Sequence, residues 1–282
     1  MNQPVSPRRQ AMASLLTQPR YEILPLPGVL EQTAELPAGS VVTVTASLRQ
    51  GVSATVEISE RLAAQGMRAV PHLAARQFHD EAELSEVVSR LEAAGIDEVF
   101  VVGGDASEPA GRFADGLSLL RSMAELGRLP ARIGVPSYPE GHRSIDEHAL
   151  WAALRAKQRY AGYTVTQLCF DADTVCRFAA AARRRGITLP IVAGVPGVVD
   201  TGTLLRVSLR IGIGESMRFV RGHRSVAGRL LRPGGYRPEA LVRKLGARAR
   251  EGRCEMAGLH IYTFNHVGAT ARWVQQAHRR AA

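Results

Sequence analysis

Eight short runs of β-branched and other apolar residues alternate along this chain with stretches of helical periodicity. The expected strands are residues 21–26, 40–46, 68–73, 98–102, 132–136, 164–169, 190–193 and 258–263. Most of them are separated by one expected helix, over residues 53–65, 81–94, 112–125, 145–159, 174–185 and 238–251. Strands that alternate with helices form parallel sheets, and eight such units close into a barrel of about 250 residues. The sequence therefore predicts the α/β class, as a (β/α)8 TIM barrel rather than an open doubly wound sheet.

The barrel is expected to form a single catalytic domain over residues 19–282, after a flexible N-terminal tail over residues 1–18. No Gly/Ser-rich linker divides the 282 residues, and 45% hydrophobic content is enough for one large core. No apolar run approaches the roughly 18 residues of a membrane helix, and the apolar patch at residues 11–16 is too short for a secretory signal. We expect a cytoplasmic protein without a membrane partner.

Charge and cysteine content exclude several classes of site. The net charge of +10 comes mostly from arginines that are scattered rather than interleaved with aromatic residues, so no nucleic-acid partner is expected. The same charge favours an anionic substrate or a phosphate-bearing cofactor. Cys169, Cys176 and Cys254 form no C-x-x-C pair, and their odd number argues against a disulfide framework or a structural zinc site. No H-x-H or H-E-x-x-H spacing occurs, so no metal is expected.

Polar side chains fall at the C-terminal ends of the expected strands, where barrels of this type carry their chemistry. They are densest over residues 134–171. In chain order the candidates are Glu22, Thr45, His72, Gly103, Gly104, Asp105, Tyr138, His142, Gln167, Asp171, Pro196, Gly197, Tyr262 and Asn265.

Glu22 is the strongest catalytic candidate among them. It lies between Tyr21 and Ile23 in an otherwise apolar strand, where an ionised carboxylate is costly to bury without a partner. A buried carboxyl that keeps its proton near neutral pH can act as a general acid. Gly103 and Gly104 would let a flat or phosphate-bearing ligand approach the backbone closely. They belong to no G-x-G-x-x-G or Walker motif, so Rossmann and P-loop sites are excluded.

Several motifs in sequence order resemble the methylenetetrahydrofolate reductase family, from Tyr21 to Trp273. They are Y-E-I-L-P at 21–25, V-T-A at 44–46, P-H-L-A at 71–74, G-G-D at 103–105, Y-P-E-G-H at 138–142, T-Q-L-C-F-D at 166–171, P-G-V at 196–198 and G-L-H-I-Y-T-F-N at 258–265. The resemblance implies a TIM barrel that reduces 5,10-methylenetetrahydrofolate to 5-methyltetrahydrofolate. The hydride would come from NADH or NADPH through bound FAD, in one-carbon metabolism and methionine biosynthesis.

The resemblance also assigns roles by position. Glu22 would be the general acid that opens the methylene bridge to an iminium ion, and Asp105 would act beside the flavin ring and the pterin. Folate would be bound by Glu22, Gln167 and Tyr262. The expected cofactor contacts are Thr45, His72, Gly103, Gly104, Asp105, Ala114, Tyr138, His142 and Lys157.

The chain departs from the family pattern at several flavin contacts. Gly103 stands where the family has an arginine. The family's Asp and Asn contacts fall near residues 150–151 and 153–154, its Arg-Lys pair is reduced to Ala156-Lys157, and Trp151 is a candidate to fill cofactor space. Each lost ionic hydrogen bond would cost about 1.5–3 kcal/mol. Two mechanisms stay open: FAD relays hydride in two half-reactions, or NAD(P)H passes it directly to the iminium carbon.

Two other functions are compatible with the sequence. One is another tetrahydrofolate-dependent barrel, such as a methyltransferase or a demethylation accessory protein. The other is a non-catalytic folate-binding barrel, against which Glu22, Asp105 and Gln167 argue because a binding module needs no buried acid. The sequence does not distinguish NADH from NADPH, since it has no ribose-reading acid at a known spacing, and it is compatible with a homo-oligomer.

Overall fold

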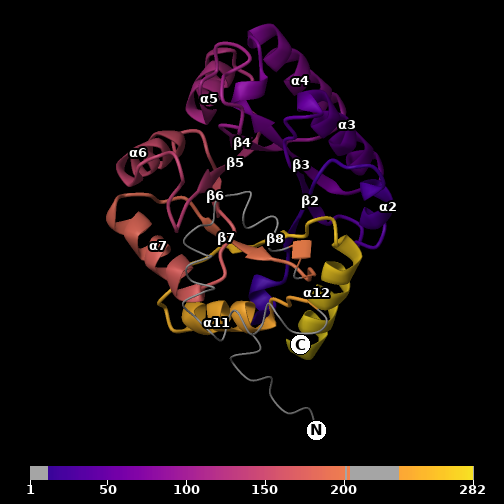
Figure 1. Cartoon of the computed structure of the whole chain (residues 1–282), viewed down its shortest axis with the longest axis vertical. Helices are drawn as coiled ribbons and strands as arrows, with labels where there is room; N and C mark the ends of the chain where they lie inside the picture. Colours follow the sequence, from indigo (N-terminus) through magenta and orange to yellow (C-terminus); the bar gives the residue numbers. More distant parts are fainter. Residues whose placement is uncertain (1–11, 201, 204–234, 282) are drawn as a thin grey trace.

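Eight parallel strands close into a barrel in chain order, with β8 pairing back onto β1. The computed structural model describes residues 12–200, 202–203 and 235–281. The strands are β1 Arg20–Ile23, β2 Val41–Val44, β3 Arg68–Ala74, β4 Glu98–Val102, β5 Arg132–Ser137, β6 Tyr163–Thr166, β7 Ile191–Pro196 and β8 Gly258–Tyr262. Figure 1 looks into the ring that they form. The predicted (β/α)8 barrel is confirmed.

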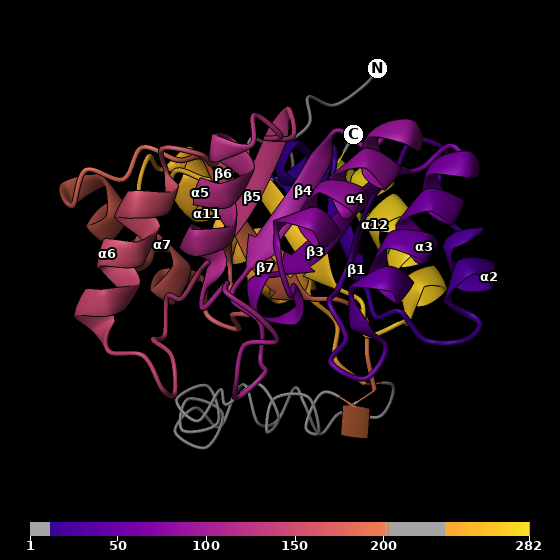
Figure 2. The same ribbon diagram turned by 90° about the horizontal axis from the view of Figure 1, so that it is seen from above.

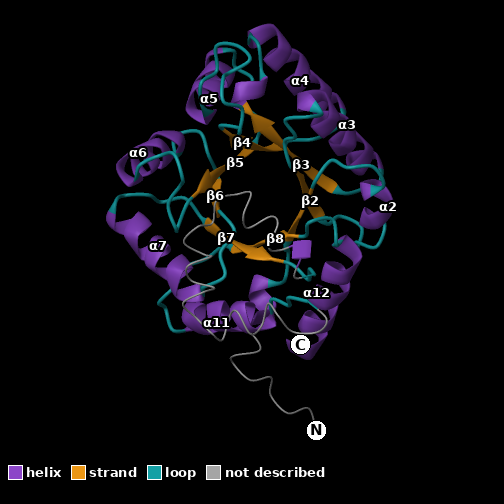
Figure 3. Cartoon of the chain, viewed as in Figure 1, coloured by secondary structure: helices purple, strands orange, loops and turns teal. Residues whose placement is uncertain are grey.

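Helices surround the ring of strands (Figure 3). They are α2 Val29–Thr33, α3 Gly51–Ala64, α4 Glu81–Ala93, α5 Gly116–Glu125, α6 Glu147–Lys157, α7 Ala172–Arg184, α11 Glu239–Arg250 and α12 Val267–Ala281, with a 3-10 turn η1 at Ala75–Gln77. The six helices expected from the sequence are present, whereas α2 and α12 were not predicted. In both views of the ribbon, α6 and α7 lie side by side on one flank (Figures 1 and 2).

Two hydrophobic clusters fill the space on either side of the strands. A small cluster lies within the barrel and is formed by Val41, Val70, Phe100, Tyr163, Val165 and Val192. A larger one packs the helices against the outside of the strands. Leu15 and Leu16, which fall within the expected tail, are buried in this outer core. Residues 1–11 lie outside the described part of the chain.

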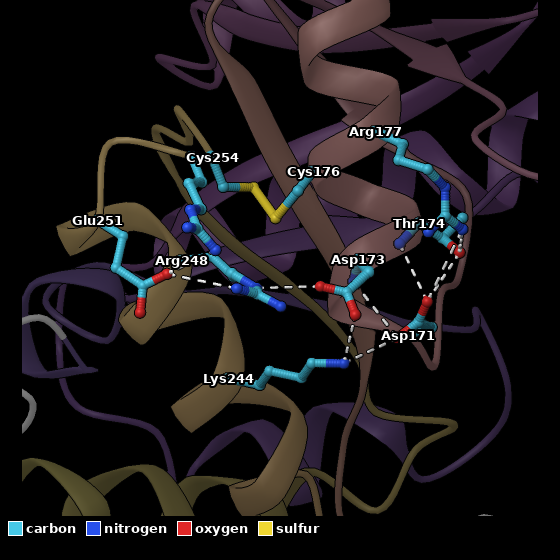
Figure 4. A network of polar contacts seen from close by, with 10 residues as sticks. Asp171, Asp173, Thr174, Cys176, Arg177, Lys244, Arg248, Glu251 and Cys254 are labelled. Atoms are coloured by element: carbon cyan, nitrogen blue, oxygen red, sulfur yellow. Dashed lines mark hydrogen bonds and ion pairs between the residues drawn. A yellow bond between two sulfur atoms is a disulfide. The ribbon is translucent and has the colours of Figure 1, made fainter.

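A disulfide joins Cys176 of α7 to Cys254, which precedes β8 (Figure 4). The two residues are 78 positions apart, and their Cα atoms are separated by 4.7 Å. The expectation of no disulfide was therefore wrong. The odd cysteine is Cys169, which is buried and free, and an odd total does not prevent the other two from pairing.

Ion pairs join α7 to α11 beside the disulfide. Lys244 and Arg248 of α11 lie 2.7 and 3.0 Å from the carboxylate of Asp173 in α7 (Figure 4). Asp171, one of the strand-end candidates, caps α7 by accepting hydrogen bonds from the backbone of Asp173 and Thr174. Capping of α7 is thus a structural reason for an aspartate at position 171.

Within the described residues, no helix has both the length and the apolar character needed to cross a bilayer.

Candidate active site

The structure places Glu22 between two histidines from other strands. Oε2 of Glu22 in β1 lies 2.9 Å from Nε2 of His260 in β8 and 3.9 Å from Nε2 of His72 in β3. The three side chains are 14%, 1% and 9% exposed, respectively. The predicted buried carboxylate is therefore present, and it has partners that relieve the cost of burial.

His72 is uncharged at neutral pH. Burial lowers its pKa to about 4, while Glu22 acts in the raising direction and His260 in the lowering direction. His72 and Glu22 therefore do not form an ion pair at neutral pH, although Nε2 of His72 lies within salt-bridge distance, 3.9 Å, of Oε2 of Glu22. The ring packs against Phe100 with a centroid distance of 4.7 Å, and Nε2 has no hydrogen-bond partner among the described residues.

His260 is the site residue that sequence reasoning missed. It alternates with Tyr262 along β8, and in a strand residues two apart face the same side of the sheet. The ring of His260 meets the ring of Tyr262 edge-on at 4.9 Å. The alternation of His260 with a selected site residue was therefore a signal available in the sequence.

Tyr262, near Glu22, and Tyr138, near Asp105, keep their phenolic protons at neutral pH. Burial raises the pKa of Tyr262 well above its usual value, with the negative charge of Glu22 as the next cause. Burial likewise raises the pKa of Tyr138 to about 12, and Asp105 adds to this shift. Tyr262 donates a hydrogen bond to the carbonyl of Thr166 at 3.2 Å. Both phenols are therefore neutral hydrogen-bond donors.

The loop that carries Gly103, Gly104 and Asp105 is held by an arginine that the sequence did not single out. Arg76, in η1, donates to the carbonyl oxygens of Ala106, Ser107 and Ala114 at 2.9, 3.4 and 3.0 Å. Asp105 itself is exposed, and no direct contact joins it to Glu22 within the described residues. Its charge acts instead on Tyr138.

The remaining candidates line different parts of the strand ends. Oγ1 of Thr45 is buried without a hydrogen-bond partner in the described chain. His142 is exposed and meets the ring of Tyr138 edge-on at 5.2 Å. The side-chain oxygen of Gln167 accepts from the backbone of Leu168 at 2.9 Å, which fixes the amide in place. The side chain of Ala114 is exposed.

Lys157 lies in different surroundings from these residues, because the charged group that acts on it is Asp115. Burial lowers the pKa of Lys157, and Asp115, the N-cap of α5, acts in the opposite direction. Among the described residues, no hydrogen bond or ion pair connects Lys157 to Glu22, His72 or His260. The structure thus places Glu22 close to His72 and Tyr262, links Tyr138 to Tyr262 and Asp105, and links Lys157 to Asp115.

The sequence had suggested that Trp151 fills cofactor space; in the structure its side chain packs against α7. Its ring stacks on Phe178 of α7 with a centroid distance of 5.0 Å and an interplanar angle of 15°. Arg185 covers the ring at 4.5 Å, and the indole nitrogen donates to Glu147 at 3.0 Å. Trp151 therefore belongs to the contact between α6 and α7.

The side chains of α6 also bear on whether the chain could hold FAD. Leu154 of α6 is buried in the outer core, and Trp151 packs on α7, so the positions of the family's polar flavin contacts are used for packing. Thr45 and His72 do offer polar atoms without partners. At these positions α6 nevertheless lacks the polar groups that would fit the nucleotide part of FAD.

Comparison with known proteins agrees with the motifs. A model of the family described as methylenetetrahydrofolate reductase matches residues 29–214. A Caenorhabditis elegans protein named probable methylenetetrahydrofolate reductase (NADPH) is 26% identical over 216 residues, which cover 71% of this chain and 32% of that protein. A 5,10-methylenetetrahydrofolate reductase from Buchnera aphidicola subsp. Baizongia pistaciae is 29% identical over 150 residues, 51% of this chain and 48% of that protein.

The two relatives are longer than the part that aligns, and the chain spans about a third of one and about half of the other. The match to the family model is the stronger finding because it extends over more than half of the chain and includes β2 to β7. The chain belongs to the methylenetetrahydrofolate reductase family.

Proposed function

We propose that this protein reduces 5,10-methylenetetrahydrofolate to 5-methyltetrahydrofolate with NADH or NADPH. The observation that carries the proposal is the nearly buried carboxyl of Glu22, held between His260 and His72 at the end of β1 in a chain of this family. A carboxyl in such surroundings is suited to donate one proton in a site with little water. The proposal includes the family's role in one-carbon metabolism and methionine biosynthesis.

The reaction requires one proton and one hydride. Glu22 protonates N10 of the folate, the bond between N10 and the methylene carbon breaks, and an iminium ion forms at N5. Hydride from the nicotinamide then adds to the iminium carbon, which becomes the N5 methyl group, and NAD(P)H leaves as NAD(P)+. A proton from solvent restores Glu22. The protein also orients the donor and the carbon and keeps water away from the iminium ion.

Neighbouring residues bind the folate in this proposal. Tyr138 is a neutral donor because burial raises the pKa of its phenol, whereas the hydroxyl of Tyr262 donates to Thr166 and offers its oxygen as an acceptor. Gln167, whose oxygen is fixed by Leu168, directs its amide nitrogen toward the pterin. Asp105 acts on the pterin from the loop that Arg76 holds.

We propose that NAD(P)H itself is the hydride donor. Support comes from α6, where Trp151 and Leu154 pack on α7 and the core instead of offering polar groups to FAD. FAD would supply a hydride relay where it is bound, and Thr45 and His72 would be its contacts. The visible absorption spectrum of the purified chain separates the two mechanisms. A colourless active protein supports direct transfer, whereas bound flavin bands would overturn it.

The experiment for the activity is the oxidation of NADH and of NADPH by the purified full chain, with and without methylenetetrahydrofolate. We expect oxidation that depends on the folate and yields 5-methyltetrahydrofolate, identified by mass. A Glu22→Gln variant tests the acid and is expected to lose about 10²–10⁴-fold in kcat. Folate binding without oxidation would instead identify a folate-binding barrel, and methyl transfer to an added acceptor would identify a methyltransferase.

A further inference from the structure

The two oxygens of the Glu22 carboxyl have different surroundings. Both histidines approach the same oxygen, Oε2, with Nε2 of His260 at 2.9 Å and Nε2 of His72 at 3.9 Å. Within the described residues, Oε1 has no hydrogen bond or ion pair. A carboxyl that is held through one oxygen keeps the other for a ligand, so Oε1 is the atom able to exchange a proton with substrate.

The tautomer of His260 follows from its burial. Its side chain is 1% exposed, and Nδ1 is buried without a hydrogen-bond partner in the described structure. A buried N–H group without a partner is rarer and more costly than a buried acceptor without one. The proton of a neutral His260 therefore resides on Nε2, and Nε2–H donates to Oε2 of Glu22.

This hydrogen bond decides where the acid proton of Glu22 lies. Oε2 already faces an N–H group, so the proton of the neutral carboxyl resides on Oε1. When Oε1 gives up that proton, Glu22 becomes a carboxylate and the bond from His260 becomes charge-assisted, a type about twice as strong as a neutral one. An interaction that strengthens as the reaction proceeds stabilises the transition state more than the ground state.

The other titratable groups that face Glu22 do not compete with His260. His72 approaches from β3 and is neutral near pH 7, because burial lowers its pKa to about 4. Tyr262 approaches from β8, and its hydroxyl donates a hydrogen bond to the carbonyl of Thr166 instead of to Glu22. The neighbouring polar side chains are Thr43 on β2 and Thr45 just after it, which carry no charge. His260 is thus the close donor to Oε2.

We propose that His260 is a positioning residue, which fixes the Glu22 carboxyl through Oε2 so that its acid proton is presented on Oε1. The proposal rests on the reductase function and names how its general acid is prepared. It assigns His260 no contact with folate or nicotinamide.

Two substitutions separate this role from a merely structural one. His260→Gln keeps an N–H donor at about the reach of Nε2, whereas His260→Leu removes the donor and keeps an apolar side chain. We expect His260→Leu to lower kcat by about 10²-fold, with KM for both substrates changed less than about threefold. His260→Gln should retain kcat within about fivefold. Equal losses in both variants, or a loss confined to KM, would overturn the proposal.

A second measurement does not depend on turnover. The carboxyl carbon of Glu22 is followed by NMR in chains labelled at glutamate carboxyls, and its signal is assigned by its disappearance in Glu22→Gln. We expect the signal to move in His260→Leu and to stay in place in His260→Gln at the same pH. An unmoved signal in a folded His260→Leu chain refutes the positioning role. If His260→Leu does not fold, His260→Met takes its place, and the same shift of the Glu22 carboxyl signal is expected.

The two measurements also distinguish the failure of each proposal. A wild-type chain without folate-dependent NAD(P)H oxidation refutes the reductase function, whatever the NMR signal does. A moved signal in that case would still support the contact between His260 and Glu22. An active wild-type chain whose His260→Leu variant keeps full kcat refutes only the positioning role.

Discussion

Arg20 and Glu98 form an ion pair inside the barrel, with Nη1 of Arg20 2.7 Å from Oε1 of Glu98. They are the first residues of β1 and β4, and their side chains are 8% and 5% exposed. Arg20 also donates to the hydroxyl of Tyr163 at 3.1 Å and covers its ring at 4.3 Å. Oε1 of Glu98 lacks a well-directed hydrogen bond, so the short contact is an ion pair by distance alone. The ion pair of Arg20 with Glu98 and the ring of Tyr163 thus fill the N-terminal end of the barrel interior.

Removing one partner of this pair should destabilise the protein strongly. In Glu98→Ala the guanidinium of Arg20 stays buried without its counter-charge, and we expect the free energy of unfolding to fall by about 3–5 kcal/mol. Urea unfolding measures the loss. Arg68→Ala is the matched control, because Arg68 lies 3.7 Å from the same carboxylate but is half exposed. Its expected cost is below about 1 kcal/mol. Similar losses in the two variants would contradict a special role for the buried pair.

The disulfide should contribute to stability through the long segment that it closes. Because Cys176 and Cys254 are 78 positions apart in the sequence, reduction of the disulfide is expected to lower the free energy of unfolding by about 2–4 kcal/mol. The measurement is urea unfolding with and without a reductant, after thiol titration has shown that both cysteines are reduced. A Cys176→Ala/Cys254→Ala chain serves as control and should not respond to reductant. An unchanged midpoint in the fully reduced wild type would show that the disulfide does not stabilise the fold.

The buried His72 should make stability depend on pH. In the unfolded chain this group takes up a proton near pH 6.5, whereas burial lowers the folded pKa to about 4. Between these values the unfolded state binds more protons, so stability falls as pH falls from 6.5 to 4. The shift corresponds to about 3 kcal/mol. Unfolding in urea at several pH values tests this, with His72→Phe as the comparison. Equal slopes for the two chains across this window would refute the shift.

Most of the fold could be predicted because its signals are local. Each strand is a run of apolar residues between turn residues, and each of the six expected helices has its own periodicity. Helix α12 had such a signal too, since Val267, Ala271, Val274 and Ala277 share one buried face. The disulfide had none, because the approach of Cys176 to Cys254 depends on how α7 packs against α11.

The site shows the same division between local and spatial information. Glu22 could be selected because a carboxylate in an apolar strand is costly to bury without a partner. Its contacts with His72 and His260 could not be predicted, because the three residues lie on different strands whose side chains meet only in the closed barrel. The direction of Trp151 depends on the rotation of α6 against α7, which the sequence pattern leaves open.

Adjacent glycines in the loop after β4 offer a last test of the candidate site. Gly104 has φ of +94°, and a Cβ added there would lie 3.2 Å from Cβ of Ala74. A side chain in this backbone region costs roughly 1–2 kcal/mol, and relief of the strain would shift Asp105, the next residue. Gly103 is the control, because an added Cβ there meets nothing within 4 Å and its φ is not positive.

We therefore expect Gly104→Ala to lower the free energy of unfolding by about 1–2 kcal/mol and to raise KM for methylenetetrahydrofolate. Gly103→Ala should be neutral, or more stable by up to about 1 kcal/mol, because alanine restricts the unfolded chain. Urea unfolding and folate-dependent NAD(P)H oxidation measure the two effects. If Gly104→Ala is destabilised but keeps its KM, the loop geometry matters for the fold and Asp105 is not a folate ligand. If both variants match the wild type, the loop does not need the left-handed conformation at Gly104.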